Sequence, residues 1–133
     1  MNLDRELIED LKEITKPLTE EDKDKLRAAP KFATMKPPRN GFQITFKNGY
    51  TVSIVWGNAT YSEARMKDIA DEDKFFSANA EVAIIRPDGE FLPFKLEGGE
   101  ITFLNPDSNA EFDVAGWVSP DVVATIIREV SWR

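Results

Sequence analysis

The sequence predicts an α+β domain: an antiparallel sheet built from β-hairpins, with an N-terminal helical hairpin and one C-terminal helix packed on one face. Two observations predict it. Apolar residues recur at helical spacing near both ends of the chain, and they alternate with polar residues between glycine-containing turns in its middle. We expect residues 1–36 to form the N-terminal helical hairpin or arm and residues 37–133 to form the α+β body, which is one compact domain for a chain of 133 residues.

Two helices and a connector are expected before the sheet. Apolar residues at steps of three and four from Leu3 to Leu18 predict a first amphipathic helix. Thr19 is a good N-cap for a second helix, Glu20–Ala29, which begins with acidic residues and has little apolar surface to bury. The prolines and cations of residues 30–41 predict an extended connector.

The middle of the chain predicts two hairpins. The strands at residues 42–46 and 50–56 flank Asn48-Gly49, a dipeptide typical of a two-residue type I′ turn. A buried strand at Glu81–Arg86 is expected to pair back with Glu90–Leu96 across a Pro-Asp-Gly turn.

The last third of the chain predicts short strands and a helix. Gly98-Gly99 ends the second hairpin, and Glu100–Leu104 and Glu111–Trp117 have the pattern of short strands. Ser119-Pro120-Asp121 combines a hydroxyl N-cap, a proline at the first helical position and an acid in the first turn. A final helix is therefore expected to follow Ser119.

Cysteine and histidine are both absent from the chain. This excludes disulfides, Cys/His zinc sites, haem held by either side chain, and catalysis by a thiol nucleophile or an imidazole base. None of the turn dipeptides Asn40-Gly41, Asn48-Gly49 and Gly98-Gly99 is followed by the helix start and lysine of a phosphate-binding loop. We therefore expect no cofactor and no enzymatic activity.

One segment resembles a calcium loop by its spacing. Oxygen-bearing residues alternate there: Asp107, Asn109, Glu111 and Asp113. However, Phe112 and Val118 stand where the loop needs its glycine and its bidentate glutamate. No metal site is expected.

Charge is distributed unevenly. The net charge is −7, and residues 68–133 hold 14 acidic but only 5 basic side chains. No lysine or arginine occurs between residues 96 and 127, so an acidic surface is expected there, formed by Glu97, Glu100, Asp107, Glu111 and Asp113. This balance disfavours direct binding to nucleic acid. Mimicry of a nucleic acid's charge and ordinary solubility both remain open as its role.

A long segment without strand pattern, residues 57–80, separates the two hairpins. Segments of this length in compact domains are often functional. Aromatic and arginine side chains are enriched in binding hot spots. We therefore expect a partner-binding surface formed by Tyr61, Arg65, Met66, Phe75 and Phe76. Alternatively, Phe75 and Phe76 anchor the segment to the core.

The sequence has no apolar run long enough to span a bilayer, and its first residues lack the basic and apolar regions of a signal peptide. A cytoplasmic protein without a membrane partner is expected. Its oligomeric state stays open.

Three segments carry a resemblance to a known group of proteins. They are Asn48–Ile54 followed by Trp56-Gly57, Ala80–Ile84 followed by Pro87-Asp88-Gly89, and Gly116–Ala124. Over residues 42–130 the chain resembles small uncharacterised proteins encoded by tailed bacteriophages, which carry an aromatic residue and an arginine shortly after the first hairpin, here Tyr61 and Arg65. The resemblance implies an infected bacterial cytoplasm, where short acidic accessory proteins bind a host component. It implies no reaction.

The leading hypothesis is a non-enzymatic phage accessory protein that binds and modulates a bacterial host protein. One alternative is a virion or structural component that self-assembles. Less favoured alternatives are an acidic mimic of nucleic acid and a histidine-free enzyme.

Overall fold

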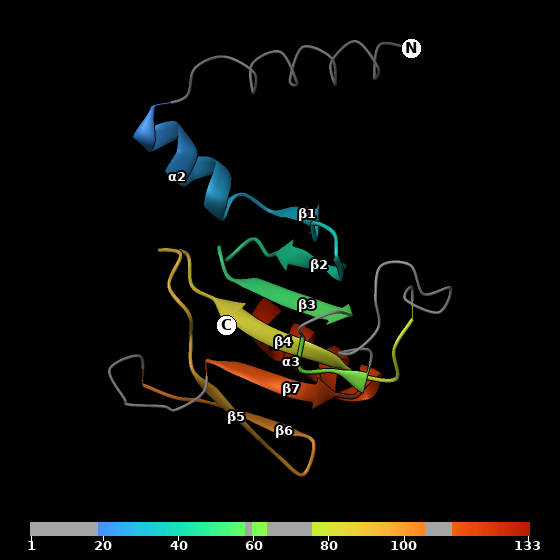
Figure 1. The fold of residues 1–133 in the computed structure, drawn as a ribbon. Helices are drawn as coiled ribbons and strands as arrows, with labels where there is room; N and C mark the ends of the chain where they lie inside the picture. Colours follow the sequence, from blue (N-terminus) through green and yellow to red (C-terminus); the bar gives the residue numbers. More distant parts are fainter. Residues whose placement is uncertain (1–18, 58–59, 64–75, 106–112) are drawn as a thin grey trace, which may run out of the picture.

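The computed structural model describes residues 19–57, 60–63, 76–105 and 113–133. They form an α+β fold with a five-stranded antiparallel sheet, a separate two-stranded sheet and a C-terminal helix (Figure 1). The fold class, the antiparallel sheet and the C-terminal helix are as the sequence predicts, whereas the division into two sheets is not predicted. The predicted first helix lies outside these residues. The elements are α2 (Glu20–Ala28), β1 (Lys31–Thr34), β2 (Arg39–Thr45), β3 (Thr51–Gly57), β4 (Ala80–Ile85), β5 (Phe94–Glu97), β6 (Glu100–Phe103), β7 (Val114–Val118) and α3 (Pro120–Ser131).

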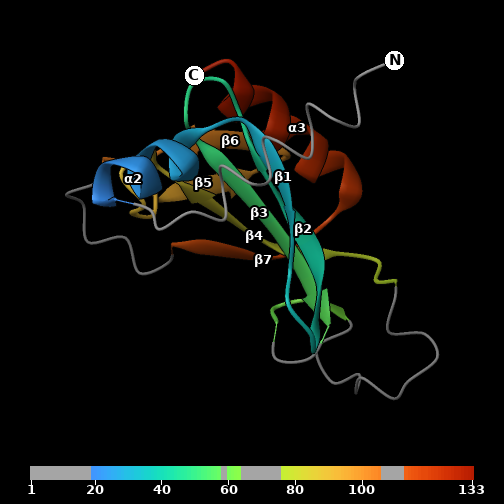
Figure 2. The ribbon, with the colours of Figure 1, turned by 90° about the horizontal axis from the view of Figure 1, so that it is seen from above.

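The core is enclosed by one face of the large sheet, by helix α3 and by the two-stranded sheet, and α3 runs along one side of the strands (Figure 2). The strand order is β1-β2-β3-β4-β7, and every neighbouring pair is antiparallel. Because side chains alternate between the faces of a strand, the central strands send every second residue into the core. The fully buried side chains of this layer are Val52, Val82, Ile84, Leu92, Ile126 and Val130.

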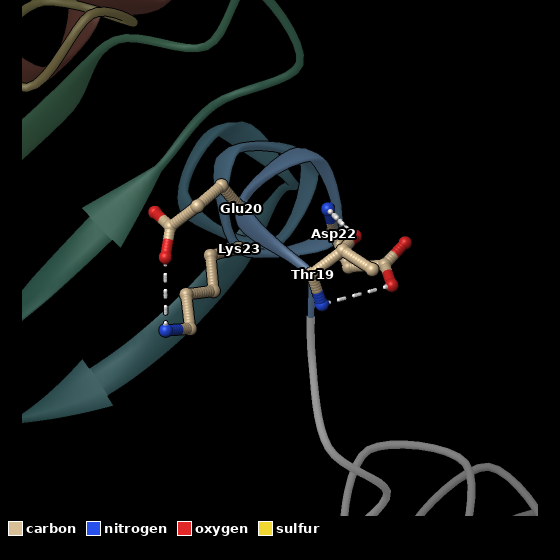
Figure 3. Close-up of polar contacts among 4 residues, drawn as sticks. All are labelled: Thr19, Glu20, Asp22 and Lys23. Carbon is tan, nitrogen blue, oxygen red and sulfur yellow. Dashed lines mark hydrogen bonds and ion pairs between the residues drawn. The ribbon is translucent and has the colours of Figure 1, made fainter.

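Helix α2 starts at the cap that the sequence predicts (Figure 3). The Thr19 Oγ1 accepts a hydrogen bond from the Asp22 N–H at 3.1 Å, and the Thr19 N–H donates to the Asp22 carboxylate at 3.4 Å. This reciprocal capping box satisfies two backbone donors that a helix start leaves unpaired. An ion pair of 3.2 Å between Lys23 and Glu20 adds little, because both side chains are exposed.

The segment 30–41, predicted to be an extended connector, contains strand β1 at the sheet edge, and in this the prediction is wrong. Strand β1 pairs with β2 in the register Phe32↔Ile44, so residues assigned from the sequence to the N-terminal arm join the sheet. Lys31 Nζ fixes the start of the strand by donating to three carbonyls at the end of α2, those of Leu26 (2.8 Å), Arg27 (2.6 Å) and Ala29 (3.2 Å). These carbonyls have no helical partner.

The first hairpin is confirmed, but its turn is not of type I′. The Phe46 N–H donates to the Tyr50 carbonyl and the Gly49 N–H to the Phe46 carbonyl, both at 2.9 Å, which leaves a three-residue loop. Gly49 has φ +86°, whereas Trp117 is the only described non-glycine residue with positive φ. Asn48 therefore does not take the left-handed conformation that a type I′ turn needs, and the loop fits a turn followed by a left-handed glycine.

Asn48 instead ties this turn to the end of helix α3. Its Nδ2 donates to the carbonyls of Val130 at 2.8 Å and of Arg133 at 3.3 Å, and its Oδ1 accepts from the Tyr50 N–H at 3.0 Å. The Arg133 guanidinium also lies 4.5 Å from the centre of the Phe103 ring, on β6. The carboxyl end of α3 is thereby held against both sheets.

The second predicted hairpin is shorter than expected. The chain after β4 forms a single bridge, Ile85↔Phe91, and then leaves the sheet at Pro93. Proline has no N–H to donate to a ladder, so the pairing does not extend to Leu96. Strand β5 pairs with β6 instead, through Gly98-Gly99, whose φ values of +58° and +80° fit a type I′ turn.

The Asn48 contacts predict a measurable effect on stability. In Asn48→Asp the oxygen that accepts from the Tyr50 N–H remains, but the donor to the Val130 carbonyl is lost and a negative charge faces the negative end of α3. We expect the free energy of unfolding to fall by about 1–2 kcal/mol in urea denaturation. The control is Lys47→Gln on the same turn, which should change it by less than about 0.5 kcal/mol. Equal stability of Asn48→Asp and the unsubstituted protein would contradict the role assigned to Asn48.

Candidate functional site

Large exposed aromatic side chains lie where the chain leaves the central strands. Strand β3 ends at Gly57, and residues 60–63 follow it at the end of the sheet where β4 begins and β7 finishes, as the pair Ala80↔Val118 shows. Tyr61 is 44% exposed and Trp117 is 56% exposed. We call these two residues the aromatic pair.

Buried hydroxyl groups hold the backbone of Tyr61 in place. The Thr60 hydroxyl donates to the Gly57 carbonyl at 2.8 Å and lies 2.8 Å from the Ser62 hydroxyl, which accepts from the Gly57 N–H at 3.4 Å. Thr60 and Ser62 are fully buried. Since the residues on either side of Tyr61 point inward and are satisfied by hydrogen bonds, the Tyr61 side chain is directed outward on a fixed backbone.

Tyr61 and Trp117 are joined through both backbone and rings. The Trp117 N–H donates to the Tyr61 carbonyl at 2.7 Å, and the ring centres lie 5.7 Å apart at an interplanar angle of 42°. This separation is in the favourable range for aromatic pairs. Gly116 permits the approach, because a Cβ at that position would lie 2.8 Å from the Tyr61 Cβ.

Trp117 has a strained backbone. Its φ is +52°, a conformation that costs a residue with a side chain about 1–2 kcal/mol. The register between β4 and β7 shifts beside it, between Ala80 and Val82, while the next residue, Val118, is buried. Such strain persists only where the surrounding structure imposes it, and it is concentrated at functional sites. The result is a tryptophan held outward.

The predicted partner-binding residues are only partly described. Tyr61 belongs to the aromatic pair. Phe76 is 65% exposed and lines a cavity beside helix α3. The other predicted members, Arg65, Met66 and Phe75, lie outside the described residues.

Trp117 was not among the binding residues predicted from the sequence. The sequence places it only at the end of the short strand Glu111–Trp117. The signal that was available is the alternation at the end of that strand, because Trp117 and Val118 must face opposite sides. Gly116 precedes Trp117, and the Ser119 helix cap follows Val118. Trp117 is therefore the aromatic residue at this strand end that the alternation could have marked as exposed and available for binding.

Two of the five residues of the predicted acidic surface lie together in the structure. Glu97 and Glu100 lie directly opposite each other beside the β5–β6 turn, and both are exposed. Lys95 Nζ lies 2.7 Å from a carboxylate oxygen of Glu97. Asp113 is exposed next to β7 of the other sheet, and Asp107 and Glu111 lie outside the described residues. Within the described ranges no group of three potential acidic ligands is placed to hold a metal ion.

The sheet face opposite α3 contains a hollow of about 270 Å³ with mixed lining. Its polar residues include Arg39, Gln43, Ser53 and Glu81. Burial raises the pKa of the half-buried Glu81 carboxyl, and the Arg39 guanidinium acts in the opposite direction. Of the described residues lining this hollow, Glu81 is the only acid, so they supply no carboxyl pair of the kind that glycoside hydrolysis requires.

Comparisons with protein families, curated proteins and solved structures find no match to this chain. In the described part of the chain, no helix combines the length and the apolar character needed to cross a membrane. The geometry of the site is therefore the basis for a functional proposal.

The environment of Glu81 predicts a pH-dependent effect on stability. A carboxyl with a raised pKa in the folded state stabilises the fold while it is protonated, and this contribution is lost as the pH rises through the folded-state pKa. We therefore expect Glu81→Gln to gain stability relative to the unsubstituted protein when urea denaturation is repeated at pH 7 instead of pH 4.

Arg39→Gln tests the cause of this effect. Removing the guanidinium should raise the Glu81 pKa further and enlarge the loss of stability between the two pH values. A stability difference between Glu81→Gln and the unsubstituted protein that does not change with pH would contradict the prediction.

Proposed function

We propose that this protein is a non-enzymatic accessory protein that binds and modulates a bacterial host protein, and that the aromatic pair is the centre of its contact surface. The observation that carries the proposal is an exposed tryptophan held in a strained backbone and in tilted ring contact with an exposed tyrosine. Tryptophan and tyrosine are the residue types most enriched in binding hot spots. The bacterial setting rests on the resemblance to proteins of tailed bacteriophages.

The energetics of such a contact are favourable. Burying the exposed parts of the two rings would remove on the order of 200 Å² of apolar surface from water, about 5 kcal/mol before the costs of association. Because hydrogen bonds already fix the Tyr61 backbone and its link to Trp117, little conformational freedom remains to be lost on binding. This preorganisation favours recognition of a partner.

The contact is expected to depend weakly on salt. Apolar burial persists when ionic strength rises, whereas attraction between exposed charges is screened. The same measurement separates the aromatic pair from the acidic surface, because a mimic of nucleic acid would bind through carboxylates such as Glu97 and Glu100.

The test compares two exposed tryptophans. Trp117→Gly removes the indole, and glycine adopts positive φ without strain. The matched control is Trp132→Ala, since Trp132 is 82% exposed at the end of α3. From bacterial lysate, the unsubstituted protein and Trp132→Ala should retain one partner at equal stoichiometry, and Trp117→Gly should retain at least about tenfold less. Recovery should persist as salt is raised from about 0.1 M to about 1 M.

Three outcomes would contradict the proposal. They are the absence of a stoichiometric partner, equal recovery by Trp117→Gly, and loss of the partner at high salt. The third would favour the acidic mimic instead.

A second candidate function, a virion or structural component that self-assembles, is favoured by the exposed edge of the large sheet. Strand β1 pairs with β2 on one side, no described strand covers its other side, and Phe32 on it is 81% exposed. An open edge is a template for pairing with another chain.

Self-assembly predicts that sedimentation velocity detects concentration-dependent oligomers and that Phe32→Lys disperses them. A monomer at every concentration would rule out the second candidate while leaving the first untouched.

A further inference from the structure

The hollow of about 270 Å³ on the sheet face opposite α3 has two different ends. At one end, Glu81 on β4 pairs with Val55 on β3, and Arg39 on β2 lies on the other side of β3. At the other end lie Ile85 and Phe91, which form an isolated bridge. The hollow is therefore charged at one end and apolar at the other.

The floor between these ends is formed by one row of residues across the sheet. The register places Gln43, Ser53 and Ala83 next to one another, followed by Val114 on β7. The Gln43 Nε2 donates to the Ser53 Oγ at 3.4 Å, and Ser53 is buried. Because serine and alanine have short side chains, the centre of this row leaves space above the sheet.

The two charges at the charged end are close but not paired. The Arg39 guanidinium lowers the pKa of the Glu81 carboxyl, against the effect of burial. Among the described residues, however, neither side chain forms an ion pair or a hydrogen bond. A carboxylate that is withdrawn from water is stabilised by an opposite charge or by hydrogen bonds. A molecule lying in the hollow can supply that partner, because Glu81 lines it and is only half-buried.

We propose that this hollow binds a free α-amino acid with an apolar side chain. The α-ammonium group would contact Glu81 and the α-carboxylate would contact Arg39, whose guanidinium can bind a carboxylate through two N–H groups. The side chain would lie over Ala83 and against Ile85 and Phe91. A ligand with a single charge fits less well, because a cation is repelled by Arg39 and an anion by Glu81.

The size of the hollow favours a single amino acid over a peptide. Its volume is below the range of sites for drug-sized ligands, about 300–1,000 Å³. A peptide also separates its terminal charges along its backbone, so both could not reach the same end of the hollow. None of the described lining residues belongs to the aromatic pair, so this is a second site beyond the proposed function.

The test uses leucine and two derivatives that each lack one charge. N-acetylleucine has no ammonium group, and leucinamide has no carboxylate. In isothermal titration calorimetry of the full chain, leucine should bind saturably with a dissociation constant of about 1 mM or lower, and each derivative at least about tenfold more weakly. Glycine should also bind at least about tenfold more weakly, because it leaves the apolar end of the hollow empty.

Two substitutions assign the charges separately. Glu81→Gln should weaken leucine binding at least about tenfold and abolish the preference for leucine over N-acetylleucine. Arg39→Gln should weaken it similarly and abolish the preference for leucine over leucinamide. The matched control is Lys36→Gln, which removes a nearby exposed cation that does not line the hollow and should change leucine binding by less than about twofold.

Urea denaturation of each variant checks that it is folded. The proposal is overturned if leucine shows no saturable binding, if either derivative binds the unsubstituted protein as tightly as leucine does, or if folded Glu81→Gln binds leucine as tightly as the unsubstituted protein.

Discussion

The apolar layer between the large sheet and helix α3 is the constraint on which the rest of the structure depends. Val52 and Ile54 of β3 and Val82 and Ile84 of β4 are almost completely buried in it. Because side chains in a strand alternate with a period of two, placing these residues inward fixes the register of both strands and directs Ser53 and its neighbours to the opposite face. The position of Glu81 in the opposite hollow is a consequence of this register.

The features with functional interest lie where this alternation ends. Trp56 is the last inward-facing residue of β3, and its buried indole N–H has no hydrogen-bond partner among the described residues. At the same end of the sheet, the register shift beside β7 leaves Trp117 outside and Val118 inside. In most of a folded protein, local backbone preferences and hydrogen bonding agree with the overall fold. Local strain and unpaired buried polar groups depart from this agreement, and such departures are expected at functional sites.

Several elements could be predicted because their signals are local. Thr19 caps α2 and Ser119 caps α3 through contacts with residues three positions away, and the first hairpin follows from alternation alone. Strand β1 was missed because four residues carry almost no periodicity, and its pairing depends on β2. In the candidate site, Tyr61 could be selected by residue type, but its ring partner Trp117 lies far away in the sequence, so their contact left no local pattern.

The sequence by itself determined which side-chain chemistry this protein lacks and where helices α2 and α3 begin, because residue types and short-range capping contacts can be read along the chain. Without cysteine and histidine, no fold could supply a thiol or an imidazole. Only the tertiary structure decided that Asn48 binds the end of α3 instead of forming a type I′ turn, that Trp117 is strained outward against Tyr61, and that Arg39 and Glu81 border one hollow. Each of these depends on which distant segments come into contact, and that is set by packing of the whole apolar layer.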